Sequence, residues 1–348
     1  MLPWTKPKTL LGVDVGSSAV KLVSLQRRRD EFIADLAAVE AIPPDIVVDG
    51  QIVDAVSLAA TMKAMVHGQK RKVRHAATSV SGHAVMAKQI TIESGLEENL
   101  DERVRREAAQ QIPFELNEVN LDYQVLSLQE DGSMEVLLVA AKKEKVSNFT
   151  SALSLAGLSV QIIDHDPFAV QNCFEFNYQP DPQEIIALLN VGATATNMNV
   201  IQGGRSRFTR DIGVGGMQST EALQKRLNLS FEAAESAKTD PEATQSEPVQ
   251  GILEGVLQAM RMEIRKTFDF YRAAGGQQLD HLYVCGGATQ MPGMVGMLQQ
   301  EFGAPAEPLD PFRRITCPEG SPASAAAHQY GPQLAVAVGL ALRSFEDL

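Results

Sequence analysis

Two stretches of the chain share one pattern of apolar and polar positions. In residues 11–25 an apolar run reaches Val15, Gly16-Ser17-Ser18 form a polar turn, and apolar positions then alternate. Residues 186–200 follow the same order. Each stretch therefore predicts a strand, a tight glycine turn and a second strand. In the alignment of the two, Asp14 matches Asn190, Gly16 matches Gly192, Ser18 matches Thr194 and Lys21 matches Asn197.

The two stretches are separated by about half of the chain, which is too long a period for a solenoid. The repeat predicts two similar halves whose glycine hairpins face a shared cleft. The alternative is a pair of unrelated surface hairpins, which are common. With 348 residues the chain is long enough for two lobes.

The pattern also predicts an inserted unit in the first half. Residues 84–163 read as strand, helix, strand, strand, helix and strand, with helices over 96–111 and 145–156. We interpret this segment as a small α+β subdomain. A connecting helix begins near Asp164, a long helix is expected over 251–274, and the strand 281–285 runs into Gly286-Gly287.

Composition narrows the classes of function. A formal net charge of −12 argues against non-specific binding of nucleic acid or anionic lipid. Three cysteines far apart in sequence give no metal-ligand spacing and no disulfide framework, which favours a reducing, cytosolic setting. No apolar run approaches the roughly 20 residues that span a bilayer, so we expect any membrane role to go through a partner.

Glycine turns after strands indicate a phosphate site. No Walker-type motif is present, but Gly16–Ser18, Gly192–Thr194 and Gly286-Gly287 each follow a predicted strand. Consecutive N–H groups in such turns form concave anion sites. Asp14 would hold a hydrated Mg²⁺, and Lys21 would neutralise phosphate charge. The alternatives are a turn-capping carboxylate at Asp14 and a solvated lysine at Lys21.

Further candidates lie in the second half. Gly215-Gly216 precede a predicted helix, whose N-terminus is a plausible second anion site. Glu263 and Lys266, on the long helix, are candidates for flanking a base, against the alternative of a solvated helix face.

These motifs resemble the actin-like ATPase superfamily and, within it, the PilM family of type IV pilus assembly proteins, which is related to FtsA. The resemblance rests on residues 11–21, 111–123, 156–158, 208–211, 215–216, 285–293 and 339–345. It implies an α/β fold of two lobes, each with a ribonuclease H-like core, plus an inserted 1C subdomain of the FtsA type. The implied division is 1A at 1–83, 1C at 84–163, a return to 1A and the connection at 164–182, 2A at 183–215, 2B at 216–279, and 2A with the final helix at 280–348.

The resemblance further implies ATP and Mg²⁺ in the interlobe cleft, with Asp14 contacting the metal through water. The implied nucleotide contacts are Asp14, Gly16, Ser17, Ser18, Lys21, Asn190, Gly192, Ala193, Thr194, Gly215, Gly216, Glu263, Lys266, Gly286, Gly287 and Ala288. It implies binding of the N-terminal cytoplasmic tail of PilN in a groove between 1A and 1C. The resemblance also implies indirect association with PilO and PilP and with pilus motor ATPases. It implies that the chain is cytoplasmic and is recruited to the cytoplasmic face of the inner membrane.

One position departs from the superfamily pattern, because Asn190 stands where an aspartate is usual. Asp166 matches the residue that orients the attacking water, although Asp-x-Pro is also an ordinary helix start. We therefore expect at most weak hydrolysis, with Asp166 and Asp14 as the catalytic candidates. The competing interpretations are an FtsA-like division protein, a GspL-type secretion protein and a sugar kinase. The first two are disfavoured by the lack of a terminal membrane helix after the final core helix.

Overall fold

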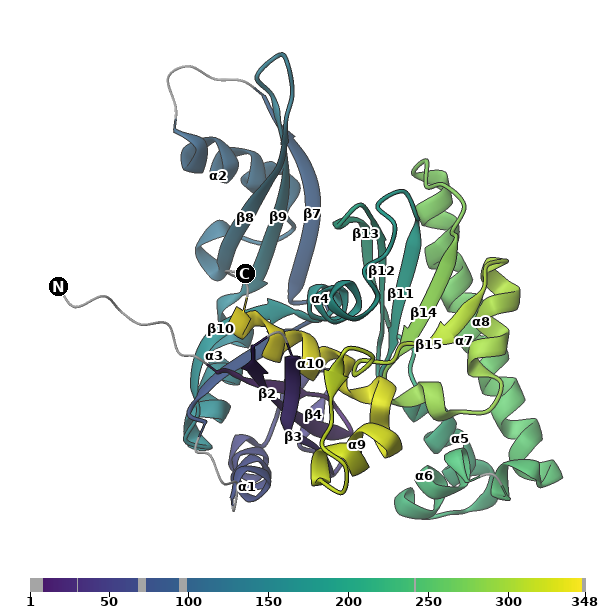
Figure 1. Ribbon diagram of the computed structural model, residues 1–348. Coiled ribbons are helices and arrows are strands. Elements are labelled where there is room, and N and C mark those ends of the chain that lie inside the picture. Colours follow the sequence, from purple (N-terminus) through teal and green to yellow (C-terminus); the bar gives the residue numbers. More distant parts are fainter. Residues whose placement is uncertain (1–8, 30, 68–72, 94–98, 241, 346–348) are drawn as a thin grey trace.

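In the computed structural model, two α/β lobes lie side by side and a smaller module projects from the first lobe (Figure 1). The structure describes residues 9–29, 31–67, 73–93, 99–240 and 242–345. Each lobe is built around one sheet. The first sheet has the order β10-β6-β1-β2-β3-β16 and the second has the order β13-β12-β11-β14-β15.

The first lobe contains the first predicted hairpin. Its strands are β1 (Leu11–Val15), β2 (Ala19–Arg28), β3 (Glu31–Ala41), β6 (His75–Val80), β10 (Ser159–His165) and β16 (Ile315–Thr316). The strands β1, β2 and β3 are antiparallel neighbours, whereas β6 and β10 continue the sheet in parallel from β1. Helices α1 (Ala55–Val66) and α3 (Lys143–Leu155) pack on one face through Leu58, Met62 and Leu153. A small ribbon, β4 (Val47–Val48) and β5 (Gln51–Ile52), precedes α1.

The second lobe repeats this plan. Its strands are β11 (Ile186–Val191), β12 (Thr196–Gln202), β13 (Arg205–Ile212), β14 (His281–Cys285) and β15 (Ala306–Pro308). Helices α5 (Met217–Leu227), α6 (Phe231–Thr239), α7 (Glu247–Ala273) and α8 (Met294–Phe302) contribute to the core on one face. In β11, Leu189 points into that core and Leu188 points into the core on the opposite face. Burial on both faces explains why this strand is a continuous apolar run.

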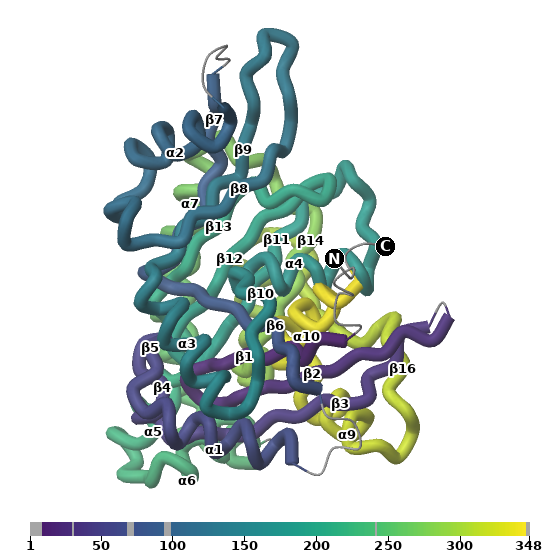
Figure 2. The backbone as a smooth tube through the Cα atoms, turned by 90° about the vertical axis from the view of Figure 1, so that its left-hand side faces the viewer, coloured from purple at the N-terminus to yellow at the C-terminus, as the bar shows by residue number. Residues whose placement is uncertain are grey.

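Two helices cross between the lobes. Helix α4 (Asp166–Tyr178) follows the first sheet but packs on β11 and β12 of the second, where the Asn199 amide donates to the Pro167 carbonyl at 3.2 Å. Helix α10 (Ala335–Leu342) follows the second sheet but packs on β1 and β2 of the first. The two helices also pack against each other, and α9 (Pro322–Tyr330) packs on β3. Each lobe is therefore covered by a helix from the other half of the chain, as Figure 2 shows from the side.

The projecting module has its own sheet and core. Its sheet has the order β7-β9-β8, with β7 (Val85–Ile92), β9 (Met134–Lys142) and β8 (Val119–Leu128). Helix α2 (Leu100–Gln111) covers the sheet through Val104 and Ala108, and the Asn99 side chain caps it by accepting from Glu102 N at 2.9 Å. The start expected at residue 96 lies outside the described residues. We call residues 85–142 the 1C module.

The pairing of β10 shows that the inserted unit ends earlier than expected. The sequence grouped the helix at 145–156 and the strand that follows it with the inserted unit, which was expected to end at residue 163. In the structure β10 pairs with β6, and α3 packs on α1, so both belong to the first lobe. The alternating pattern identifies a strand but does not identify the sheet in which that strand pairs, which is why the boundary near 142 was missed.

Small residues permit the crossing of α4 and α10. A Cβ added at Gly339 in α10 would overlap the backbone oxygen of Ala169 in α4, and one at Gly12 in β1 would overlap the backbone oxygen of Ala337. Backbone atoms are the neighbours in both cases, so side-chain rearrangement cannot relieve the overlap. The two lobes consequently meet at backbone–backbone contact.

We expect Gly339→Ala to lower the free energy of unfolding by more than about 2 kcal/mol, because the helices would have to separate. Gly255→Ala in α7 is the matched control, since that exposed helical glycine has open space around it. In the control, the higher helix propensity of alanine should raise the free energy of unfolding by about 0.5–1 kcal/mol. Urea unfolding followed by circular dichroism measures both, and equal midpoints for the two variants would contradict the packing argument.

Candidate functional site

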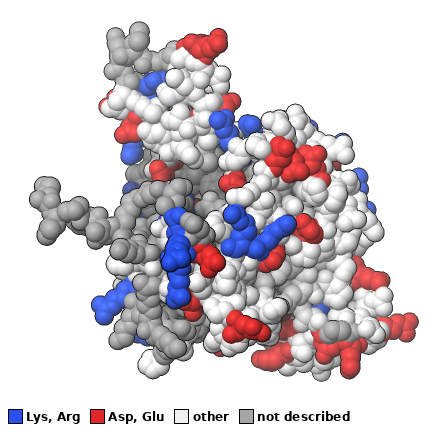
Figure 3. Space-filling view, viewed as in Figure 1, with Lys and Arg blue, Asp and Glu red and all other residues white. Residues whose placement is uncertain are grey.

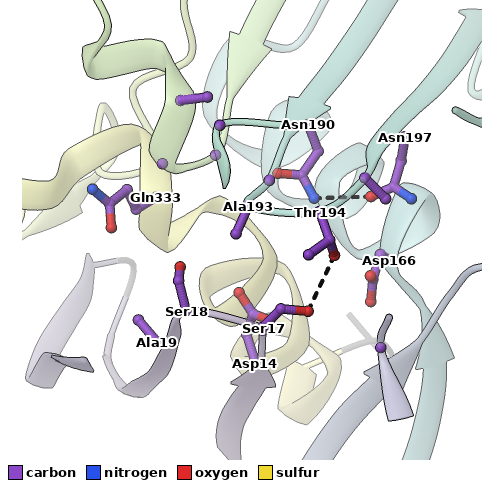
Figure 4. A pocket seen from close by; sticks show the side chains of 18 of the residues that line it. Asp14, Ser17, Ser18, Ala19, Asp166, Asn190, Ala193, Thr194, Asn197 and Gln333 are labelled. Carbon is purple, nitrogen blue, oxygen red and sulfur yellow. Dashed lines mark hydrogen bonds between the residues drawn. The ribbon is translucent and has the colours of Figure 1, made fainter. Parts of the chain in front are cut away.

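The two glycine hairpins face each other across the space between the lobes (Figure 4). In the first hairpin, Gly16 N donates to Ala19 O at 3.1 Å, and in the second, Gly192 N donates to Ala195 O at 2.9 Å. The Ser17 and Thr194 hydroxyls lie 3.1 Å apart and join the two turns by a hydrogen bond. The predicted hairpins are therefore equivalent in fold and in direct contact.

A cavity of about 650 Å³ opens around these turns, a size typical of small-molecule sites. Its wall includes most of the residues singled out from the sequence: Asp14, Gly16, Ser17, Ser18, Lys21, Asp166, Asn190, Gly192, Ala193, Thr194, Gly216, Gly286, Gly287 and Ala288. Residues far apart in sequence thus meet in one cavity. Gln333, from the turn before α10, completes the wall beside Gly287.

The polar pairs behind the two turns differ in charge. Asp14 and Lys21 are cross-strand partners in β1 and β2, and their side chains form an ion pair at 3.2 Å. At the equivalent register of the second hairpin, the Asn190 amide donates to the Asn197 side-chain oxygen at 3.0 Å. The second hairpin has therefore kept the geometry of the pair and lost its charges.

Asp14 is a largely buried carboxyl group on the cavity wall, and Lys21 is its ion-pair partner. Burial raises the pKa of Asp14, and the nearby Asp166 carboxylate raises the pKa further, although Lys21 acts in the opposite direction. Asp166 lies at the start of α4 on the cavity wall and accepts a hydrogen bond from the Ser81 hydroxyl. Two carboxyl groups facing one cavity suit a hard cation that keeps most of its water shell.

The paired glycines before α5 have a different role from the one expected. Gly216 N donates to Gly192 O at 2.9 Å and Met217 N donates to Ala193 O at 2.8 Å. A Cβ at Gly215 would overlap the Ala193 carbonyl. These N–H groups support the second hairpin from behind, so they are not free to bind an anion, although Gly216 still lines the cavity.

Gly286 requires its glycine. Its φ is 90°, and an added Cβ would overlap the Val191 carbonyl. Gly286 N donates to Pro332 O at 3.0 Å, which ties the end of β14 to the turn between α9 and α10. The backbone of β14 therefore passes against β11 at the rim of the cavity.

The two charged residues expected beside a base lie elsewhere. Glu263 and Lys266 form an exposed ion pair with each other at 2.5 Å, and neither lines the cavity. Glu235 and Lys238 of α6 stand on the cavity wall instead. The Lys238 ammonium is buried and donates to Glu235 at 2.6 Å and to the Thr220 hydroxyl at 3.0 Å. The sequence could have predicted the position of Lys238 from Ala234, because an apolar residue four positions earlier places Lys238 on the buried face of the helix.

The sequence reasoning also gave no role to Asp211, at the end of β13. Its carboxylate lines the cavity and accepts from Asn197 Nδ2 at 2.6 Å and from Gly82 N at 2.5 Å. Gly82 lies in the other lobe, so the contact depends on tertiary structure that no local pattern reveals.

The comparisons with known proteins agree with this geometry. The family model for type IV pilus assembly protein PilM matches residues 12–345. The chain belongs to the PilM family. The resemblance deduced from the motifs is therefore confirmed, and the division-protein and sugar-kinase interpretations are disfavoured.

Several solved structures share the fold of this PilM-family chain. A structure described as the PilM–PilN type IV pilus biogenesis complex is 27% identical, covers 98% of this chain and 99% of that one, and has a TM-score of 0.86. The ethanolamine utilization protein EutJ from Carboxydothermus hydrogenoformans is 16% identical, with coverages of 97% and 90% and a TM-score of 0.60. MreB 5 of Spiroplasma citri bound to AMPPNP is 14% identical, with coverages of 98% and 97% and a TM-score of 0.53. The expected actin-like ATPase fold is confirmed.

Among the helices of the described residues, not one combines the length and the apolarity that crossing a membrane requires.

Proposed function

We propose that this PilM-family chain is a nucleotide-binding scaffold of type IV pilus assembly, with ATP and Mg²⁺ held in the interlobe cavity. The observation that carries the proposal is the contact between the two glycine hairpins through Ser17 and Thr194. Turns of this kind present N–H groups to an anion from two sides, and the cavity of about 650 Å³ has room for a nucleotide. The MreB structure, which shares the fold, carries a nucleotide analogue.

Each part of the nucleotide finds a suitable group in the cavity. The triphosphate lies between Gly16–Ser18 and Gly192–Thr194, and Lys21 offsets part of its charge. Asp14 binds the hydrated Mg²⁺, which relieves the unfavourable burial of its carboxylate. Glu235 and Lys238 lie beside the nucleoside, as do Gly286 and Gly287. The metal neutralises phosphate charge when bound.

Hydrolysis is weak in this proposal. Asn190 lines the cavity without a charge, and its side-chain nitrogen donates to Asn197, so it attracts the metal and the proton of an attacking water less strongly than a carboxylate does. Asp166 remains as a group that positions water, but it also accepts from the Ser81 hydroxyl. ATP therefore acts mainly as a ligand that holds the lobes together.

The partner in this proposal is the N-terminal cytoplasmic tail of PilN, bound in a groove between subdomain 1A and the 1C module. The similar PilM–PilN complex supports this assignment. Both flanking sheets end in edge strands, β10 in the first lobe and β8 in the module, and an extended tail can use such edges. PilN then connects the chain to PilO and PilP and holds it at the cytoplasmic face of the inner membrane, within reach of the pilus motor ATPases.

We expect a fluorescently labelled PilN tail peptide to bind the full chain, and to lose affinity when the peptide sequence is scrambled. Fluorescence anisotropy measures both. Equal binding of the native and scrambled peptides would contradict the assignment of the partner.

We expect Lys238→Met to weaken ATP binding by about tenfold, equivalent to about 1.4 kcal/mol. The methionine keeps the apolar stem but removes the cation from the cavity wall, and Glu235 loses its ion-pair partner. Lys266→Met is the matched control, because that lysine is exposed on α7 and lies outside the cavity. Displacement of a fluorescent ATP analogue at fixed Mg²⁺ gives the two affinities, and equal losses in both variants would argue against a nucleotide in this cavity.

The charge at position 190 should control the rate of hydrolysis. We expect the wild-type single-turnover rate to lie well below the roughly 1 s⁻¹ at the lower end of ordinary enzymes. Asn190→Asp should raise this rate by about tenfold or more, because a carboxylate can assist the attacking water. A fast wild-type rate, or a variant that gains nothing while still binding ATP, would contradict the proposed role of Asn190.

A further inference from the structure

The chain passes between the first lobe and the 1C module at two places, which we call the module root: residues 81–84 on the way out and 142–145 on the way back. Hydrogen bonds join the two passages to each other. Lys142 N donates to Ala84 O at 2.9 Å, and the Lys145 ammonium donates to Ser81 O at 2.7 Å. Ser81 and Gly82 also line the interlobe cavity. The root is therefore both the base of the module and a part of the proposed nucleotide site.

Acidic side chains from both lobes hold the outgoing passage. Asp166 of the first lobe accepts from the Ser81 hydroxyl, and Asp211 of the second lobe accepts from Gly82 N at 2.5 Å. Gly82 has a φ of 82°, a conformation that suits glycine and aims its N–H at the second lobe. The module root thus bridges the two lobes at the cavity wall.

A continuous chain of hydrogen bonds joins the root to the second glycine hairpin. The Asn190 amide donates to Asn197 Oδ1 at 3.0 Å, Asn197 Nδ2 donates to Asp211 Oδ1 at 2.6 Å, and Gly82 N donates to Asp211 Oδ2. Asn190 lies just before the turn at Gly192, which we assign to the phosphates. Three side chains, those of Asn190, Asn197 and Asp211, therefore connect that turn to Gly82.

A buried cation makes the position of Asp211 important. The Lys145 side chain is 4% exposed, and burial lowers the pKa of its ammonium group, whereas Asp166 and Asp211 favour its charged form. Moving the second lobe away would take the Asp211 carboxylate from this ammonium and from Gly82. Separation of the lobes and displacement of the root are therefore energetically linked.

Among the described residues, few contacts hold the outer part of the 1C module against the second lobe. Beyond the root, the Gln89 side chain on β7 donates to Ser206 O on β13 at 2.5 Å. The outer end of the module stands clear of the second lobe, with a notch between them (Figure 3). A module held near its base and unsupported at its tip changes orientation when the base shifts.

We infer that Asp211 is the positioning residue that couples the nucleotide cavity to the orientation of the 1C module, and through it to the groove for the partner tail. This inference rests on the proposed function. Closure of the lobes on the nucleotide brings Asp211 onto Gly82 and fixes the root, whereas opening releases it. The coupling is reciprocal, so the tail peptide also changes the affinity for nucleotide.

The test is Asp211→Asn in the full chain. Both partners of Asp211 are donors, and an asparagine amide accepts at only one oxygen, so the substitution removes one link with little change in volume. Asp211→Ser is a second variant, and the half-buried position tolerates the smaller side chain. Asp269→Asn, at an exposed position of α7, is the matched control.

The readout is the ratio of the dissociation constants of a PilN tail peptide without nucleotide and with saturating ATP and Mg²⁺. Saturation is verified for every variant by titration, and folding by the unfolding midpoint. We expect the wild type and Asp269→Asn to change affinity by at least about fivefold. In Asp211→Asn and Asp211→Ser the ratio should fall to within about twofold of one.

The outcomes separate the inference from the proposed function on which it rests. If a folded Asp211 variant keeps the wild-type ratio, or if the wild type binds both ligands with a ratio of one, the coupling role is overturned and the scaffold function stands. If the wild type binds no nucleotide or no peptide, the proposed function and the inference both fall.

Discussion

The crossing of α4 and α10 is the constraint on which the rest of the structure depends. Gly339 brings the backbones of the two helices into contact, and each helix packs on the sheet of the opposite lobe. Lobes joined in this way share one core between their sheets, built from α4, α10 and the inner faces of β2 and β11. The ends of β1 and β11 are thereby held opposite each other, which is the condition for the two glycine turns to act together on one ligand, as we propose. A substitution that separates the helices would disturb the cavity without touching it.

The duplicated hairpins show how one geometry can serve two electrostatic roles. Asp14 with Lys21 and Asn190 with Asn197 occupy the same register and form the same cross-strand contact. Only the first pair carries charge, so the first hairpin is suited to a cation and phosphates. The second pair is a hydrogen-bond link that continues to Asp211. In the proposed function, the uncharged side chain at position 190 both weakens hydrolysis and connects the ligand to Asp211.

The local sequence pattern was sufficient to predict those elements whose structure depends on neighbouring residues in the chain. Alternating apolar positions and a glycine turn define each hairpin, and burial of β11 on both faces made its apolar run easy to identify. Features that depend on pairing between distant segments were missed. The strand β10 has the same pattern in either sheet, Asp211 acquires its role only from Gly82 in the other lobe, and the N–H groups of Gly216 and Met217 are used by the second hairpin. Glu263 with Lys266 and Glu235 with Lys238 are both short-range helical pairs, and the packing of α6 against the cavity distinguishes them.

In the proposed function, one nucleotide is held by both hairpins at once. The decisive test is a crystal structure of the full chain with a non-hydrolysable ATP analogue and Mg²⁺. We expect the β- and γ-phosphates to lie between the backbone of Gly16–Ser18 and that of Gly192–Thr194, with a water ligand of the metal hydrogen-bonded to Asp14. A nucleotide bound to one hairpin alone, or at a site outside the interlobe cavity, would contradict binding by both hairpins.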